Sequence, residues 1–123
     1  MLVEINSAKL VLFPFLISKE SNWLSPTFKD VKPEVVIHAA AMKHIDLMET
    51  NPIAGCNVNV IGSLNVAEAS IINDVPITVG VSTDKACLPE SVYGASKYIM
   101  ERVFMLRIFE VISPGCYLKK GVY

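Results

Sequence analysis

The spacing of two short apolar runs constrains the fold of this chain of 123 residues more than any other feature. Residues 35–40 and 77–81 each have the length of a buried strand, and the segment between them is long enough for one helix. Strands that alternate with helices form a parallel sheet with right-handed crossovers. The pattern therefore predicts an α/β fold built on a parallel sheet.

The segment between the two runs has the features of a long helix. Pro52 suits a first helical turn, so we predict a helix over about 53–73. Gly62 is roughly 1 kcal/mol less favourable in a helix than Ala, and a close approach to the sheet or to a ligand explains it. Asn59 and Asn65 lie near the packing side, each as a satisfied structural amide or as a ligand contact. Steps of three and four residues predict one buried stripe: Val58, Ile61, Asn65, Ala69 and Ile72.

A second helix is predicted after the run at 77–81. Ser91 is a suitable N-cap, Tyr93 falls in the first turn, and the helix extends to about Arg107. Its predicted apolar stripe consists of Ile99, Val103 and Leu106.

The remaining segments give weaker patterns. We predict strands over 10–13 and 107–112, the first limited by Pro14. We predict irregular structure elsewhere, namely 21–28 (a loop or a short helical turn), 42–51 and 116–123.

The composition predicts a single folded domain, assigned to residues 1–123. Hydrophobic residues make up 52%, charged residues 19%, and the net charge is -1, which argues against disorder and against nucleic-acid binding. The longest apolar run, 10–17, is shorter than the ~20 residues of a membrane-spanning helix. Three scattered cysteines indicate reduced thiols and a cytoplasmic protein, and the two histidines give no metal-ligand spacing.

Polar side chains follow the second apolar run directly. Thr83, Asp84 and Lys85 come after residues 77–81, and Tyr93 and Lys97 follow at the start of the predicted helix. Ligands of open α/β sheets bind at the carboxyl ends of the strands. We therefore place the candidate site in this stretch.

Tyr93 and Lys97 are four residues apart, so they share one helix face. A neighbouring ammonium stabilises a phenolate and lowers the pKa of the phenol, which can then accept a proton from an alcohol. This pattern alone has low specificity, and the hydroxyl of Thr83, which could bind the same substrate oxygen, strengthens it. Asp84 and Lys85 are either an exposed turn pair of little energetic value or an acid and a base for eliminating water beside a carbonyl.

Five motifs occur together and in order: H-A-A-A-M-K-H at 38–44, N-P at 51–52, N-V-I-G at 59–62, S-T-D-K-A at 82–86 and Y-G-A-S-K at 93–97. Taken jointly, they resemble the extended short-chain dehydrogenase/reductase family, and within it the UDP-N-acetylglucosamine 4,6-dehydratases of polysaccharide biosynthesis. The resemblance covers about 28–106. It implies a Rossmann-like doubly wound parallel sheet, a nucleotide-sugar substrate, NADP as cofactor with NAD as the alternative, and a homo-oligomer for full-length members.

The resemblance also implies roles for the five polar residues. Tyr93, held as phenolate by Lys97, takes the proton of the sugar O4 while NADP⁺ receives the hydride, and Thr83 hydrogen-bonds the same oxygen. Lys85 then removes the C5 proton, Asp84 protonates the departing C6 hydroxyl, and the hydride returns to C6.

The resemblance assigns binding roles as well. The alanines that end the run at 35–40 would line the cofactor, although small side chains there are explained equally well by packing against a helix. The cofactor-binding residues implied are Ala39, Ala40, Lys43, Asn59, Thr83, Tyr93 and Lys97, and the substrate-binding residues are Lys43, Thr83 and Lys85.

Both ends of the chain depart from the family pattern. No G-x-G-x-x-G motif occurs, and the first strand and its glycine-rich loop have no recognisable counterpart. After Arg107 the pattern also stops, so we expect a partial Rossmann-like domain, truncated at both ends. Two alternatives to the dehydratase follow: a non-catalytic fragment or interaction module of the same fold, and a sugar-nucleotide C4 epimerase or reductase. Asp84 and Lys85 argue against the last, because a reductase needs no second acid–base pair.

Overall fold

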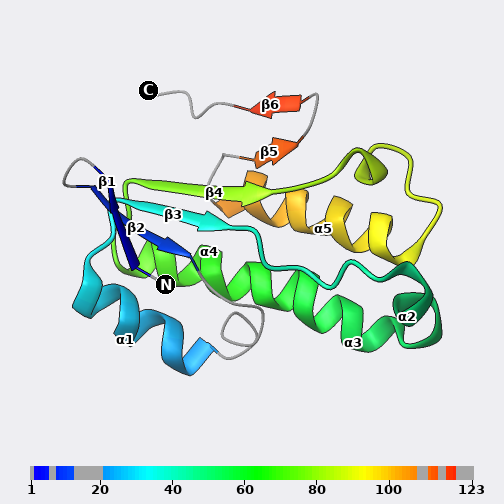
Figure 1. Cartoon of the computed structure of the whole chain (residues 1–123), viewed down its shortest axis with the longest axis horizontal. Helices are drawn as coiled ribbons and strands as arrows, with labels where there is room; N and C mark the ends of the chain where they lie inside the picture. Colours follow the sequence, from blue (N-terminus) through cyan, green and yellow to red (C-terminus); the bar gives the residue numbers. More distant parts are fainter. Residues whose placement is uncertain (1, 6–7, 13–20, 108–110, 114–115, 119–123) are drawn as a thin grey trace.

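Alternating burial along the two central strands determines how the layers pack. The computed structural model describes the backbone of residues 2–5, 8–12, 21–107, 111–113 and 116–118, and the side chains of residues 23–106. In β3 (Val35–His38) and β4 (Ile77–Val81), every second residue is buried. Because successive side chains of a strand point to opposite faces, the buried set marks the face that the helices cover. Figure 1 shows α1, α4 and α5 together on that side of the sheet.

The sheet has six described strands in the order β1-β2-β3-β4-β5-β6. The pairs β2–β3, β3–β4 and β4–β5 are parallel, with Ile37 opposite Val79. Antiparallel hairpins form both edges. The predicted α/β fold with a parallel sheet is therefore confirmed. The outer strands are β1 (Leu2–Ile5), β2 (Ala8–Leu12), β5 (Val111–Ser113) and β6 (Cys116–Leu118).

The predictions for the ends of the chain were only partly right. The strand expected at 10–13 is observed as β2, whereas Pro14 lies outside the described residues. Residue 107 belongs to a helix, and the strand expected at 107–112 begins at Val111. No element was predicted within 116–123, but Cys116–Leu118 form β6. Its pairing with β5 supplies an order that its own sequence does not signal.

The segment 21–28, expected to be a loop or a short helical turn, is part of the eleven-residue helix α1 (Ser21–Val31), which contains Pro26. Leu24 and Phe28 lie four residues apart and are both fully buried. They form one hydrophobic cluster with residues of β3 and α4. This burial outweighs the unfavourable helix propensity of proline.

The expected irregular segment at 42–51 also contains a helix, α2 (Ile45–Thr50). Six residues are too few to show a helical period in the sequence. The fully buried Met48 fixes this helix, and its side chain occupies the space where a Cβ on Gly55 would lie.

The long helix predicted at 53–73 is confirmed as three consecutive helical segments: α3 (Pro52–Cys56), the π-helical η1 (Asn57–Ile61) and α4 (Gly62–Ile72). The predicted stripe is wrong at Ile61 and Ile72, which are 43% and 69% exposed. A π-helical turn holds more residues than an α-helical turn, so it offsets the buried face. The buried residues of α4 are Gly62, Ser63, Val66, Ala67, Ala69 and Ser70.

The second predicted helix is confirmed as α5 (Val92–Arg107), but its apolar stripe is wrong. Ile99 and Leu106 are 44% and 80% exposed. The buried face instead carries Ser96, Lys97, Met100 and Phe104. Two of these four side chains are polar, so a stripe chosen by hydrophobicity misses this face.

No helix in the described part of the chain combines the length and apolar character required to cross a bilayer.

We predict that Phe28→Ala destabilises the fold by about 3–5 kcal/mol, because it removes a fully buried aromatic ring from the cluster that joins α1 to the sheet. Urea unfolding followed by circular dichroism measures this change. The control, Trp23→Ala on the same helix, removes a ring that is 66% exposed and is expected to cost less than about 1 kcal/mol. Equal costs for the two variants would contradict the assigned core.

Candidate active site

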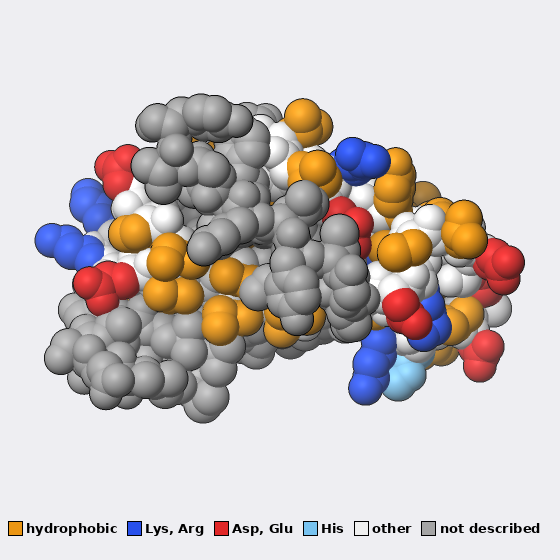
Figure 2. All heavy atoms as spheres, turned by 90° about the horizontal axis from the view of Figure 1, so that it is seen from above, with side chains coloured by type: hydrophobic (Ala, Val, Ile, Leu, Met, Phe, Trp, Pro, Cys, Tyr) orange, Lys and Arg blue, Asp and Glu red, His pale blue; other side chains and the backbone are white. Residues whose placement is uncertain are grey.

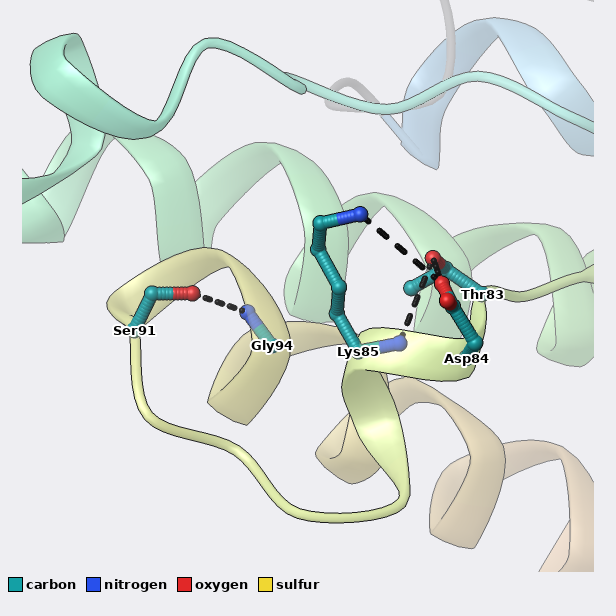
Figure 3. Close-up of polar contacts among 5 residues, drawn as sticks. All are labelled: Thr83, Asp84, Lys85, Ser91 and Gly94. Carbon is teal, nitrogen blue, oxygen red and sulfur yellow. Dashed lines mark hydrogen bonds and ion pairs between the residues drawn. The ribbon is translucent and has the colours of Figure 1, made fainter.

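The segment that follows β4 folds into a tight turn that brings three polar side chains together. Thr83 is the N-cap of the 3-10 turn η2 (Asp84–Ala86), where its hydroxyl accepts from the Lys85 backbone N–H at 3.5 Å. The same hydroxyl donates to Oδ1 of Asp84 at 3.0 Å. The Lys85 ammonium lies 3.8 Å from that carboxylate oxygen, and Figure 3 shows these contacts. Asp84 and Lys85 therefore form an exposed pair at the carboxyl end of β4.

The carboxyl group of Asp84 favours its ionised form. The hydrogen bond from Thr83 is the main reason that its pKa lies below the ordinary value, and the neighbouring Lys85 charge adds to the effect. In the free protein at neutral pH, Asp84 is consequently a hydrogen-bond acceptor. The role of proton donor, which the family resemblance implies, requires a proton that this environment disfavours.

Lys97 is nearly buried, with 4% of its surface exposed, and it reaches the end of β4. Its Nζ donates to the backbone carbonyl of Val81 at 2.6 Å. Burial lowers the pKa of the ammonium to about 8, although the negative charge of Glu101 opposes this effect. Within the described residues the Tyr93 phenol and Lys97 make no hydrogen bond, so the ammonium is anchored to β4 rather than to the phenol.

The first turn of α5, which carries Tyr93, is held from two sides. The Ser91 hydroxyl accepts from the Gly94 backbone N–H at 3.1 Å, which confirms the predicted N-cap. A carboxylate oxygen of Glu49, from α2, accepts from the Val92 backbone N–H at 2.7 Å. Both acceptors lie where the helix dipole favours negative charge. The half-buried Tyr93 is thus carried on a fixed backbone.

The first turn of α5 also touches η2 directly. A Cβ on Gly94 would lie 2.5 Å from the backbone carbonyl oxygen of Lys85, closer than side chains normally come. Glycine is therefore required where the two segments meet. This contact brings the turn with Asp84 and Lys85 against the helix with Tyr93.

Asn59 connects the loop after β3 to α5. Its amide accepts from the Met42 backbone N–H at 2.7 Å and donates to the Met42 carbonyl at 3.0 Å. It also donates to the Ser96 hydroxyl at 2.9 Å. With 1% of its surface exposed, Asn59 is a satisfied structural amide in the free protein. The loop that Asn59 holds at Met42 also carries Lys43, one of the residues predicted to bind a cofactor.

The other predicted cofactor residues follow β3 at the same edge of the sheet. Since β3 and β4 are parallel, the residues after His38 lie at the same sheet edge as those after Val81. Ala39 and Lys43 are exposed and Ala40 is half-buried. Exposure of Ala39 favours an open approach to the backbone over packing beneath a helix.

The structure reveals a role for His38 that the sequence analysis did not assign. Ser63 donates its hydroxyl proton to the Asn59 carbonyl at 2.6 Å, so it accepts from Nε2 of His38 at 2.9 Å. The ring stacks on Phe104 with centroids 6.0 Å apart, and Nδ1 has no partner among the described residues. Burial, assisted by the Lys97 charge, lowers the pKa of His38 to about 4. The sign of this role in the sequence is that His38, a polar residue, ends an otherwise apolar strand.

Charges are mixed around this end of the molecule. Figure 2 shows acidic and basic side chains interspersed with hydrophobic ones at the end that carries α2 and the start of α5. A pocket of about 360 Å³ lies elsewhere, at the amino ends of β3 and β4, where Lys32, Glu34, Asp74 and Pro76 contribute to its lining. It is remote from the strand ends at which ligands of such sheets bind.

Comparison with known proteins identifies the family. The model of a family described as polysaccharide biosynthesis protein matches residues 3–111. The chain belongs to this family. It is 40% identical over 87 residues to a UDP-N-acetylglucosamine 4,6-dehydratase (inverting) of Campylobacter jejuni, covering 71% of this chain and 25% of the relative. It is 35% identical over 115 residues to a UDP-glucose 4-epimerase of Rickettsia prowazekii, covering 94% and 33%.

A solved structure confirms the Rossmann-like fold of this member of the polysaccharide biosynthesis family. The dTDP-4-dehydrorhamnose reductase of Bacillus anthracis, in complex with NADP, superposes with a TM-score of 0.70 at 26% identity. The match covers 80% of this chain and 40% of that one. The chain thus spans well under half of the length of each of these three proteins.

We predict that Gly94→Ala destabilises the protein by about 1–3 kcal/mol, because the added Cβ meets the rigid Lys85 backbone and forces η2 away from α5. Thermal and urea unfolding measure the loss. Ile99→Ala, on the exposed side of the same helix, is the control and should cost less than about 1 kcal/mol. A stabilised Gly94→Ala, as helix propensity alone would give, would refute the close contact.

We predict that His38 makes the fold acid-sensitive. Its pKa is about 4 in the folded chain and 6.5 in the reference state, so the unfolded chain binds more protons between these values. Stability therefore falls as pH drops from 6.5 towards 4. At ~1.4 kcal/mol per pH unit, this loss is limited to about 3 kcal/mol. Urea unfolding at pH 7 and at pH 4.5 should show a smaller loss for His38→Asn than for the wild type; identical losses would contradict the assignment.

Proposed function

We propose that the site belongs to a sugar-nucleotide 4,6-dehydratase of the UDP-N-acetylglucosamine type, acting in polysaccharide biosynthesis with NADP, or with NAD as the alternative. The observation that carries this proposal is the direct contact of η2 with the first turn of α5 at Gly94. Through this contact, an acid–base pair, Asp84 and Lys85, and an alcohol-oxidising pair, Tyr93 and Lys97, belong to one site. The similarity to the Campylobacter dehydratase supports the same reaction.

The first half of the reaction uses Tyr93, Lys97 and Thr83. Tyr93 takes the proton of the sugar O4, and the ammonium of Lys97 favours the phenolate through its charge. Thr83 hydrogen-bonds the same oxygen and orients the alcohol. When bound, the nicotinamide supplies the chemistry that the side chains lack, by accepting a hydride from C4 and later returning it to C6.

The second half uses the pair at η2. In the free protein, Lys85 and Asp84 form an exposed ion pair with 3.8 Å between Nζ and Oδ1. A bound sugar would exclude water from this pair, and a desolvated ion pair favours its neutral form. Transfer of one proton from Lys85 to Asp84 produces a neutral amine and a carboxylic acid. The amine then removes the C5 proton, and the acid protonates the C6 hydroxyl, which leaves as water. Lys85 is then an ammonium again and Asp84 a carboxylate, and the ammonium can return a proton to C5 when the hydride adds to C6.

The residues present fit one half of a dinucleotide better than the other. Lys97, Thr83 and the exposed Ala39 lie at the edge where a nicotinamide and its ribose would be held, with Ala40 and Lys43 close by in sequence. No glycine precedes Gly55, so residues 1–54 contain no glycine-rich loop of the kind that holds a pyrophosphate in dinucleotide-binding folds. The second candidate is a non-catalytic fragment or interaction module of the same fold.

A C4 epimerase is the remaining alternative within the family, supported by the Rickettsia relative. Epimerisation requires Tyr93, Lys97 and Thr83 but makes no use of an acid–base pair for elimination. The partnered Asp84 and Lys85 therefore favour the dehydratase.

The decisive experiment incubates the purified chain with NADP⁺ and UDP-N-acetylglucosamine and follows loss of one water by mass spectrometry. If the dehydratase proposal is correct, Lys85→Ala reduces water loss by at least ~100-fold while C4 oxidation persists. Lys29→Ala, an exposed lysine at the opposite end of the sheet, is the matched control and should retain the wild-type rate.

Each alternative has its own outcome in this experiment. A C4 epimer has the mass of the substrate, so it is detected by ¹H NMR of the same reaction; its formation without water loss would establish the epimerase. If the chain binds neither NADP⁺ nor NAD⁺ at millimolar concentration, the non-catalytic fragment is the interpretation that remains. Undiminished elimination by Lys85→Ala would refute its role as the base.

A further inference from the structure

A hydrogen bond joins Ser82, the residue that precedes the candidate site, to Glu101 in the middle of α5. The hydroxyl of Ser82, directly after β4, donates to Oε1 of Glu101. Ser82 is buried, and Glu101 is half-buried. The sequence analysis assigned a role to neither residue, although Ser82 is the first residue of the S-T-D-K-A motif. The pair fixes the backbone from which Thr83 extends.

A second hydrogen bond between α5 and β4 lies one residue earlier on the strand side and one helical turn earlier on α5. Lys97 donates to the carbonyl of Val81, and Lys97 and Glu101 are four residues apart on the same face of α5. Consecutive residues at the end of β4 are therefore each held by an ionisable side chain of α5. One of these side chains is a cation and the other an anion.

The charge balance around Lys97 gives Glu101 its importance. A nearly buried ammonium is unfavourable unless a negative charge compensates it. The Lys97 charge helps to keep His38, on β3, neutral above about pH 4, and a histidine could add only positive charge, so His38 offers no compensation. Glu101 opposes the effect of burial on the lysine, and no carboxylate of the described residues forms an ion pair with Lys97.

We propose that Glu101 is a positioning residue of the candidate site, which holds the end of β4 against α5 through Ser82 and compensates the charge of the Lys97 ammonium one turn away. The effect of Glu101 on catalysis rests on the proposed function, because Glu101 affects the reaction only if Lys97 stabilises the Tyr93 phenolate and binds a nicotinamide ribose. The geometric and electrostatic parts concern the free chain alone. They can be tested without turnover.

The main test is an NMR titration of lysines labelled with ¹³C at Cε in the full chain, with the Lys97 signal assigned by its loss in Lys97→Arg. Glu101→Gln keeps an acceptor for Ser82 and removes the charge. We expect the Lys97 midpoint to fall from about 8 by at least about half a pH unit. Glu101→Asp, which retains the charge, should stay closer to the wild type.

Glu90→Gln is the matched control, since this carboxylate is exposed and lies just before α5. Its removal should leave the Lys97 midpoint within about 0.2 pH units, because exposed charges are screened. An unchanged midpoint in folded Glu101→Gln, or an equal change in Glu90→Gln, would overturn the electrostatic part. A purely structural role for Glu101 changes stability but not this midpoint.

Ser82→Ala tests whether Glu101 positions the end of β4. It also keeps the proposal testable if Glu101→Gln does not fold. It removes the hydrogen bond but leaves the Glu101 charge, so the Lys97 midpoint should change little. Amide hydrogen exchange at Thr83 and Asp84 should accelerate by at least about tenfold. Unchanged exchange at both amides would refute the positional part of the proposal.

Nucleotide binding separates this proposal from the proposed function. If the wild-type chain binds NADP⁺, Glu101→Gln should weaken binding by about tenfold and Glu90→Gln should not. If the wild-type chain binds no nicotinamide cofactor, the proposed function fails, while the Lys97 midpoint and the exchange rates still decide the role of Glu101.

Discussion

The first turns of α5 lie against the end of β4 so closely that only glycine fits at position 94, where a Cβ would meet the Lys85 carbonyl oxygen at 2.5 Å. The same helix sends Lys97 to the Val81 carbonyl and receives the Ser82 hydroxyl on Glu101. Every polar group of the candidate site is attached to one of these two segments or to the loop beside them. Their contact determines which side chains can act on a common substrate.

Polar groups make up much of the interior at this end of the sheet. Asn59 bonds to the loop at Met42 and to Ser96 on α5, while His38 bonds to Ser63. Hydrogen bonds between buried polar groups order their members more strictly than apolar packing, because each lost partner leaves a buried group unpaired. The loop after β3, the helix α4 and the helix α5 are joined in this way around the carboxyl edge of the sheet.

Sequence reasoning succeeded where the signal was local and failed where burial decided. The strand at 77–81 and the Ser91 cap were predicted because an apolar run and a capping hydroxyl act within a few residues. Helix α1 was missed because Leu24 and Phe28 matter only through contacts with β3 and α4. The buried face of α5 was misassigned because Lys97 is stabilised by a carbonyl that is distant in sequence.

The sequence by itself determined the α/β class, the two central strands with the helix that follows each, and the set of reactive groups between Thr83 and Lys97, since periodicity and side-chain chemistry are local properties. Tertiary structure alone decided that Lys97 contacts β4 instead of the Tyr93 phenol, that Asn59 is internally satisfied, and that Glu101 faces Ser82. These outcomes depend on burial and on partners far apart in the chain, and packing of α5 against β4 brings them into contact.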